Sequence, residues 1–345
     1  MKADQVATAD FEYHLPAELI AQTPSAVRGE SRLLMLDRDR RTIADRHFVD
    51  LAELIPPGDL LVLNSTKVRH ARLLGRRPSG APAEVLLIHP GADDTWVAMG
   101  QPGSALRPGK RIALGEGIEV ETVAVLDGAN RLVRFVGGTA EQAMDRFGRL
   151  PLPPYIERAP DGTDDERYQT VFAEREGSVA APTAGLHFTA GLLAALGDRG
   201  VAIEQLDLEV GPGTFQPVEA TDPREHRMHR ETFTIPESLA ERFATTRQAG
   251  RHVWAVGTTV VRALESAIRA EGGLRVGPQA TELLILPGFE FRAVDRLITN
   301  FHLPRSTLLM LVSAFGGMAL VREGYRHAIE ARYRFYSYGD AMVIR

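Results

Sequence analysis

The sequence predicts an α/β (α+β) main body that is interrupted by a small inserted antiparallel β-barrel-like domain. Apolar runs at residues 59–64 and 252–257 are typical of buried strands, and a helical pattern directly follows the second. Residues 69–136, in contrast, contain short apolar-rich or alternating runs separated by Gly, Pro, Asp and Asn, which is typical of compact antiparallel β structure. A chain of 345 residues is long enough for both units. We therefore expect a main body of residues 1–68 and 150–345 and an inserted β-rich domain of residues 69–149.

Along the first half of the chain, one helix and two strands of the main body precede the inserted domain. Residues 15–22 (LPAELIAQ) predict the helix, and residues 31–38 and 59–64 predict the strands. Strands of the inserted domain are expected at residues 83–90, 94–100, 110–117, 118–126 and 131–137. A proline-rich segment then returns the chain to the main body, and the acidic residues 161–166 (DGTDDE) predict an exposed loop.

The second half of the chain alternates predicted helices and strands. Thr189 is a suitable N-cap for a helix that ends at Gly200, and Pro236 suits the first turn of another that ends at Gly250. The other expected strands are residues 201–211, 252–257 and 282–288, and the other expected helices are residues 257–273, 305–317 and 319–335.

Composition and charge exclude several classes of site. The chain contains no cysteine, which excludes disulfides, thiolate catalysis and metal sites with cysteine ligands. Its formal net charge is −5, so contacts to nucleic acid have to come from local basic clusters. Residues 1–16 lack a signal-peptide pattern, and the most apolar stretch, residues 308–321, is too short to span a membrane. We therefore expect a soluble cytoplasmic protein with no membrane partner.

A predicted strand leads into Gly257, Thr258 and Thr259, where a helix begins. The free backbone amides and the dipole of a helix N-terminus favour an anion such as a phosphate or carboxylate. Arg262 and Glu265 are three residues apart and share a face of this helix. The alternative is that a threonine only caps the helix and that Arg262 and Glu265 form a surface ion pair.

Three segments contain histidines that are candidates for proton transfer near neutral pH: His187, His229 and His302. Asn300 stands in the polar turn that contains His302, between a strand and a helix, where α/β folds place ligand contacts. A hydrogen-bonded structural role is the alternative for each histidine. A metal site is disfavoured because no HExxH arrangement is present.

The glycine-rich segment GPGTF at residues 211–215 follows a predicted strand, but no helix follows it. A dinucleotide-binding loop requires that helix, so the segment is not a Rossmann fingerprint. Two interpretations remain, a turn that lets a ligand approach the backbone and a plain turn.

Basic residues gather in two further segments. The first contains four arginines within nine residues, and in the second arginines alternate with aromatic residues, an arrangement that can hold phosphates and stack bases. The alternative is a solvated surface over core aromatics. The candidate RNA contacts are Arg69, Arg72, Arg76, Arg77, Arg332 and Tyr336.

Taken together, segments along nearly the whole chain resemble the S-adenosylmethionine:tRNA ribosyltransferase-isomerase family of queuosine biosynthesis. They occur in the order of that family, and two of them are long enough to exclude chance similarity. The segments include DFEYHLPAELIAQTP, GDLLVLNSTKV, PLPPYI, ERYQTVFA, VAAPTAGLHFT, VGPGTFQPV, HRMHRE, AVGTTVVRALES, ITNFHLPRSTLLMLVSAFGG and YRFYSYGDAMVI.

This resemblance implies an α/β body with an inserted β-barrel-like domain and an unusual use of S-adenosylmethionine as a ribosyl donor. Members of the family act on tRNA that contains 7-aminomethyl-7-deazaguanine, giving epoxyqueuosine and releasing adenine and methionine. The partner implied is the anticodon arm of tRNA, no metal is expected, and we expect a monomer or a weak homodimer.

The resemblance also suggests roles for the candidate residues. Gly257, Thr258 and Thr259, together with Arg262, are expected to hold the donor carboxylate or hydroxyls. His187 and His229 are the acid–base candidates. We expect Asn300 and His302 to line the same pocket.

The sequence departs from the family pattern at Ser65, where aspartate is common, and at Glu209, where histidine is common. Residues 275–282 (RVGPQATE) also differ from the expected form. The alternative functions are a diverged paralogue that uses the same donor on another acceptor, a non-catalytic RNA-binding protein and, third, a metal-dependent hydrolase.

Overall fold

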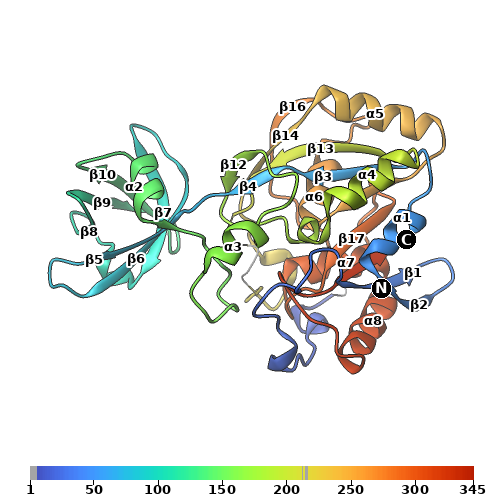
Figure 1. The fold of residues 1–345 in the computed structure, drawn as a ribbon, viewed down its shortest axis with the longest axis horizontal. Helices are drawn as coiled ribbons and strands as arrows, with labels where there is room; N and C mark the ends of the chain where they lie inside the picture. Colours follow the sequence, from blue (N-terminus) through green and yellow to red (C-terminus); the bar gives the residue numbers. More distant parts are fainter. Residues whose placement is uncertain (1–5, 212, 214–216) are drawn as a thin grey trace.

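The computed structural model describes residues 6–211, 213 and 217–345 and shows a larger body with a smaller sheet at one end of the long axis (Figure 1). Both chain termini lie on the larger body (Figure 1). The mixed α/β class predicted from the sequence is confirmed.

A nine-stranded mixed sheet forms the centre of the larger body. Its four strands β13, β3, β15 and β17 are neighbours and run parallel to one another. Their carboxyl ends therefore meet at one edge of the sheet, where α/β proteins place their ligands. In spatial order the strands are β16 (Gly277–Thr281), β14 (Glu231–Ile235), β13 (Ala202–Leu208), β3 (Leu60–Asn64), β15 (Val253–Val256), β17 (Arg296–Asn300), β18 (Ala341–Ile344), β1 (Arg32–Asp37) and β2 (Thr42–His47).

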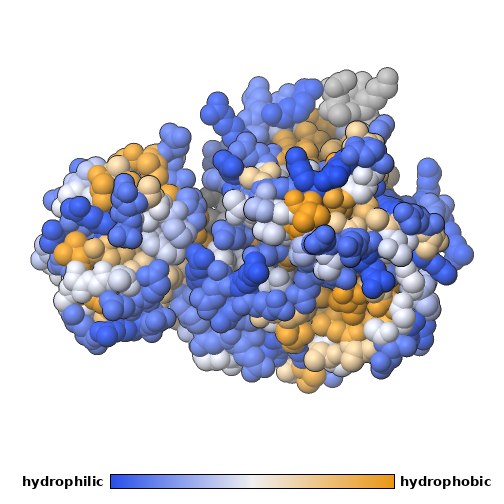
Figure 2. Space-filling view, turned by 90° about the horizontal axis from the view of Figure 1, so that it is seen from above, coloured by the Kyte–Doolittle hydropathy of each residue, from blue (hydrophilic) through white to orange (hydrophobic). Residues whose placement is uncertain are grey.

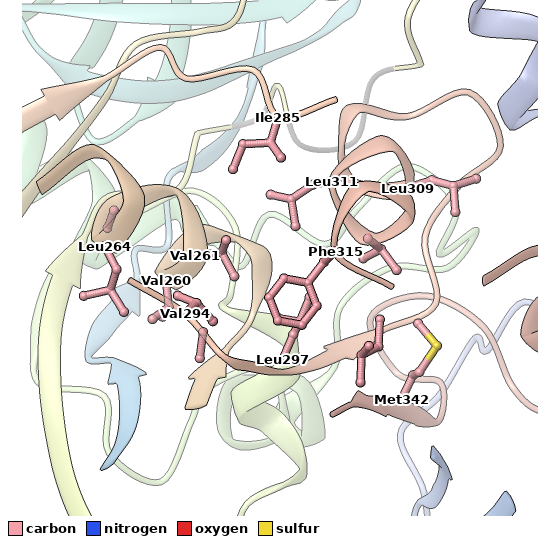
Figure 3. Close-up of a cluster of buried hydrophobic side chains, with 14 of the residues drawn as sticks. Val260, Val261, Leu264, Ile285, Val294, Leu297, Leu309, Leu311, Phe315 and Met342 are labelled. Carbon is pink, nitrogen blue, oxygen red and sulfur yellow. The ribbon is translucent and has the colours of Figure 1, made fainter. Parts of the chain in front are cut away.

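Successive side chains of a strand point to opposite faces of a sheet, so this sheet has two apolar faces. Each face is covered by a different set of helices. In β3, Leu60 and Val62 belong to one apolar cluster, and Leu61 and Leu63 belong to the other. The first cluster includes residues of α5 (Glu237–Gln248), α6 (Thr258–Ala267), α7 (Thr307–Gly316) and α8 (Met318–Glu330), and α6 and α7 meet in it as Figure 3 shows. The second includes residues of α1 (Leu51–Leu54) and α4 (Ala190–Asp198).

The smaller sheet is antiparallel and has its own apolar cluster, which includes Leu73, Val85 and Val133. A pairing of Arg76 with Ala113 also joins β5 to β8, but closure of the sheet into a barrel stays a prediction. In spatial order its strands are β11 (Gly148–Arg149), β5 (Arg72–Arg76), β6 (Pro82–Pro90), β7 (Thr95–Gln101), β10 (Arg131–Val136), β9 (Ile118–Val125) and β8 (Arg111–Gly115).

Beside the two larger sheets the chain forms a two-stranded sheet, and a helix packs against the smaller of the two larger sheets. Strands β4 (Thr66–Val68) and β12 (Arg175–Ser178) pair with each other in parallel. Helix α2 (Ala140–Phe147) contacts strands β5, β8 and β11 of the smaller sheet. The helix begins with a capping box in which the Thr139 side chain accepts from the Gln142 amide.

Three sequence predictions are wrong. Residues 15–22 do not form an α-helix, because only a 3₁₀ turn at Ala17–Leu19 is present, and Ile20 already has extended backbone angles. Residues 161–166 are exposed as expected except at Asp164, which is fully buried, but they do not form a loop, because α3 (Gly162–Arg167) forms there, capped by Asp161. Residues 282–288 contain no strand; the backbone oxygen of Leu283 instead accepts from Arg262 Nε.

No helix among the described residues has both the length and the apolar content needed to cross a membrane by itself. In the described part of the chain only α7 and α8 taken together reach that length and content, and they are bent by 115° at Gly317. The surface seen in Figure 2 is mostly hydrophilic on both lobes, with separate hydrophobic patches.

Candidate functional site

Segments that follow the parallel strands converge on one small cavity at the carboxyl edge of the main sheet. Its volume is about 60 Å³. Val210 follows β13, Gly257 follows β15 and Asn300 ends β17. The sequence prediction that Asn300 and His302 line one pocket is consistent with this cavity, and Thr258 and Thr259 line it too. The remaining lining residues are Tyr155, Ala181, Pro182, Thr183, Ala184, Thr299, Phe301, Leu303, Leu308, Tyr336 and Ser337.

The backbone at Gly257 positions the first turn of α6 against this cavity. Gly257 has φ 93° and ψ 152°, a conformation that residues with a Cβ rarely adopt. Val261 donates its amide to the oxygen of Gly257, so the amides of Thr258, Thr259 and Val260 precede the intrahelical ladder. These amides and the helix dipole favour a negatively charged or hydroxyl oxygen at this point.

Asn300 has a buried side-chain oxygen without a partner among the described residues. Its Nδ2 donates to the backbone oxygen of Tyr336 at 3.0 Å and to Nε2 of His187 at 3.1 Å. Because the Tyr336 oxygen can only accept, these contacts fix which end of the amide is nitrogen. Oδ1 then remains unpaired, although Asn300 is only 2% exposed. Such a group costs free energy unless a ligand or water donates to it.

His187 lies behind Asn300 and does not line the cavity. Its Nε2 accepts from Asn300, so the ring proton is on Nδ1, which donates to Ser31 Oγ at 2.8 Å. The ring lies 5.0 Å from that of Phe48. Burial lowers the pKa of His187 to about 4, so the imidazole is neutral at pH 7. Its role in proton transfer stays a prediction, and its contacts are those of a group that orients Asn300.

His302 does line the cavity and is also neutral. Its Nε2 is 2.8 Å from Thr299 Oγ1, and its backbone amide donates to the Tyr325 hydroxyl at 2.9 Å. Burial lowers the pKa of His302 to about 3. At pH 7 this imidazole therefore contributes hydrogen bonds rather than a positive charge.

A second, larger cleft adjoins the cavity through Leu308, which lines both. Its volume is about 380 Å³, and its walls come from both sheets. The smaller sheet contributes residues such as Ile88 and Met99, and the main body contributes Gly213 and His229. A Cβ at Gly213 would lie 2.2 Å from His229 Cδ2, so only glycine allows this approach. Of the predicted loop at residues 211–215, Pro212, Thr214 and Phe215 lie outside the described residues.

Arg262 faces this cleft rather than the small cavity. It forms a buried ion pair with Glu231, and its Nε donates to Leu283 O. Glu265 points elsewhere and accepts from the amides of Ala293 and Val294. The alternative of a surface pair between Arg262 and Glu265 is therefore wrong, because each is buried with a different partner. The sequence analysis did not identify Glu231 as a candidate residue. It is the last residue of the segment HRMHRE.

The predicted RNA-binding residues do not form one surface. Arg72 is paired with Glu84 at 3.1 Å, and Arg69 lies over the Trp96 ring at 5.5 Å. Arg76 and Arg332 are exposed, whereas Arg77 is partly buried. Tyr336 is 6% exposed and lines the small cavity, where its ring is 4.7 Å from that of Tyr155. It therefore belongs with Asn300 rather than with the arginines.

The departures at Ser65 and Glu209 lie outside both cavities. Ser65 Oγ donates to the Leu206 oxygen at 3.2 Å. Glu209 packs against Gly177 and lines a separate depression with Asp207 and Thr232, because it points away from its cavity-lining neighbour Val210. Among the described residues no group of three or more His, Asp or Glu side chains is arranged to hold a metal ion.

Comparison with known proteins finds relatives along nearly the whole chain. A family model described as queuosine biosynthesis protein matches residues 8–344. The S-adenosylmethionine:tRNA ribosyltransferase-isomerase of Azoarcus sp. (strain BH72) is 50% identical over 336 residues, which cover 97% of this chain and 96% of that protein. The protein of the same name from Aromatoleum aromaticum is 52% identical with the same coverage. The crystal structure of S-adenosylmethionine tRNA ribosyltransferase from Thermotoga maritima is similar with a TM-score of 0.56 and 35% identity, covering 97% of this chain and all of that one.

Proposed function

We propose that this chain, which belongs to the queuosine biosynthesis protein family, is an S-adenosylmethionine:tRNA ribosyltransferase-isomerase. It transfers the ribosyl part of S-adenosylmethionine onto 7-aminomethyl-7-deazaguanine in the anticodon arm of tRNA, isomerises it to the epoxide of epoxyqueuosine, and releases adenine and methionine. The family suggested by the sequence motifs is confirmed by the family model and by relatives of about half identity. The reaction takes place in the cytoplasm, and no metal takes part.

The observation that best supports this function is the unpaired Oδ1 of Asn300 beside the first turn of α6. The cavity there has a volume of about 60 Å³. Sites that hold a whole ligand usually have volumes of about 300–1,000 Å³, so this cavity is far too small for one. It therefore holds one end of the donor, and the remainder extends past Leu308 into the larger cleft. Asn300 Oδ1 accepts from a donor amine or hydroxyl, and the amides of Thr258 and Thr259 bind an oxygen.

The chemistry follows from the donor. Its sulfonium makes the neighbouring C5′ protons acidic, and loss of one gives an ylide that expels adenine and opens the ribose. The amine of the base then adds, and methionine leaves as the epoxide forms. These steps need a base, an acid and oriented polar groups. His229 in the cleft is the proton carrier that we propose, and His302 contributes hydrogen bonds as a neutral imidazole.

A single incubation tests this function. Purified protein, S-adenosylmethionine and tRNA that contains the 7-aminomethyl-7-deazaguanine precursor are combined, and adenine release is followed with the mass of the digested nucleoside. Stoichiometric adenine with a nucleoside of epoxyqueuosine mass is the expected result. If folded protein binds the donor but gives neither product, a diverged paralogue with another acceptor is favoured. Tight RNA binding without donor binding would favour the non-catalytic alternative.

His187→Ala is expected to lower turnover about tenfold, because Asn300 loses one of the two acceptors that orient it. His187→Gln, whose amide oxygen can accept from Asn300, should restore most of that loss. Since the pKa of His187 is lowered to about 4, neither variant should change the pH profile of kcat/KM between about pH 6 and 8. Loss of one limb of that profile in both variants would assign proton transfer to His187 itself.

We also propose that residues 69–149 form a separate β-barrel-like domain whose arginines contact tRNA phosphates. Neutralising Arg69, Arg76 and Arg77 to glutamine should lower the slope of log affinity against log salt by about 0.7–0.9 for each phosphate that the variant no longer neutralises. Arg72→Gln is a matched comparison with a smaller expected change, because Glu84 already neutralises Arg72. Binding of an anticodon stem-loop at several salt concentrations measures this slope, and an unchanged slope in the triple variant would remove these residues from the interface.

A further inference from the structure

The cleft between the two sheets contains a buried ion pair with an unused hydrogen-bonding group. Arg262 is 3% exposed and Glu231 is 5% exposed. Arg262 donates from Nη1 to Glu231 Oε2 and from Nε to the Leu283 oxygen, but Nη2 has no partner in the part of the chain that the structure describes. Leaving a buried donor of this kind unpaired costs free energy, so the site favours a further acceptor at this point.

The charges of the pair decide what kind of acceptor fits. Arg262 and Glu231 neutralise each other, so the pair offers a donor beside an acceptor without a net charge. Binding of a carboxylate or phosphate at this point would instead require a positively charged side chain that has no counter-ion in the protein. Burial and the neighbouring His229 lower the pKa of His226, which favours its neutral form, and Arg230 at the cleft is exposed and screened by solvent. The pair therefore suits a neutral polar edge.

We propose that Arg262 and Glu231 bind the 2-amino-6-oxo edge of a guanine-type base that is turned out of the RNA. This inference rests on the proposed function and names the part of the substrate that the cleft recognises. The edge presents a carbonyl oxygen beside two N–H donors. Arg262 Nη2 donates to the carbonyl oxygen, and Glu231 accepts from the ring N–H and the exocyclic amine. Enzymes that act on a flipped base read its pairing edge in this way.

The rest of the cleft fits a planar base. Its volume of about 380 Å³ lies within the range of about 300–1,000 Å³ that is usual for ligand sites. Ile88, Val97 and Met99 of the smaller sheet provide apolar surface for the faces of the ring. Leu308 lines both this cleft and the small cavity that holds one end of the donor, so the base would lie in the cleft beside the part of the donor that extends past Leu308.

The test compares two anticodon stem-loops, one with 7-aminomethyl-7-deazaguanine and one whose base lacks only the 2-amino group. The unchanged protein is expected to lose about 10- to 100-fold in kcat/KM on the second, because Glu231 is left without its partner. Glu231→Gln keeps the size of the side chain and an oxygen for Arg262. It should lower kcat/KM on the first stem-loop and reduce the difference between the two to about threefold or less, with unchanged affinity for S-adenosylmethionine in calorimetry.

Asp295→Asn is the matched control. Asp295 also accepts from an arginine, Arg247, at 2.8 and 2.9 Å, but it lines neither cavity, so full discrimination should persist. Full discrimination in Glu231→Gln, or a loss of donor affinity, would overturn the inference. If Glu231→Gln does not fold, equal kcat/KM of the unchanged protein on both stem-loops would overturn it as well. Failure of the proposed function can be distinguished from failure of this inference, because the unchanged protein would then release no adenine with either RNA.

Discussion

Asn300→Ala is expected to lower kcat/KM for adenine release about 100-fold, the size of effect seen when one preorganised hydrogen-bonding group is removed from a site. The variant removes Oδ1, the buried acceptor that has no partner in the described structure. It also removes the donor to Tyr336 O and His187 Nε2, so the lining of the cavity loses an anchor. Turnover assays at saturating and limiting S-adenosylmethionine, with calorimetric measurement of donor affinity, would show whether binding or the later steps are affected.

Asn64→Ala separates this effect from a general loss of stability. Asn64 is also a buried asparagine at the carboxyl end of a parallel strand, but all its contacts are internal. Its Nδ2 donates to Leu208 O, and its Oδ1 accepts from the amides of Leu208 and Thr66. Both variants should unfold more readily by about 1–3 kcal/mol. Only Asn300→Ala should lose donor affinity, and an equal loss in both variants would mean that Asn300 only stabilises the fold.

The strands that determine the position of the site could be predicted because their patterns are local. The apolar runs at 59–64 and 252–257 correspond to β3 and β15, and Thr189 caps α4 as expected. Strand β14, which lies between β16 and β13, could not be predicted, because the charged Glu231 occupies one of its buried positions and only Phe233 and Ile235 are left as an apolar pattern. The irregular backbone at residues 282–288 depends on tertiary contacts such as that of Leu283 O with Arg262, which composition does not report. The helix at Gly162–Arg167 does have a local signal in its N-cap Asp161, although its acidic, polar composition favours a loop.

Much of the candidate site could also be predicted, but its internal arrangement could not. Asn300 and His302 are expected in one pocket because a polar turn between a strand and a helix is a common ligand position. Long-range contacts determine two features of the site that the sequence does not show. His187 lies behind Asn300, and Arg262 lines the larger cleft instead of the small cavity. Arg262 is 31 residues from its partner Glu231 in sequence, and only the antiparallel addition of β14 to the sheet brings them together.

Asp164→Ala is expected to lower the free energy of unfolding by about 2–4 kcal/mol, because the buried Tyr338 hydroxyl loses its acceptor and the partly buried Arg158 loses its counter-ion. The carboxylate accepts from Arg158 at 2.6 and 2.7 Å, from the Tyr338 hydroxyl at 2.6 Å and from the Asp161 amide at 2.9 Å. Burial alone would raise the pKa of Asp164, but the hydrogen bonds from Arg158 and Tyr338 outweigh it and lower the pKa below the usual value. Urea denaturation at pH 7 measures the loss.

The lowered pKa also sets the sign of the pH dependence. The stabilisation by Asp164 is fully present above the unfolded-state pKa of about 3.9 and is lost as the pH falls through the lower pKa of the folded state. Asp164→Asn should therefore remove part of the acid sensitivity of the unchanged protein below about pH 4. Asp165→Ala is the control on the same helix, because Asp165 is exposed and its change should stay within about 0.5 kcal/mol. If the two alanine variants were equally stable, the contacts of Asp164 with Arg158 and Tyr338 would not hold this segment on the main body. The segment would then contribute as little to the free energy of unfolding as the exposed loop that its composition predicts.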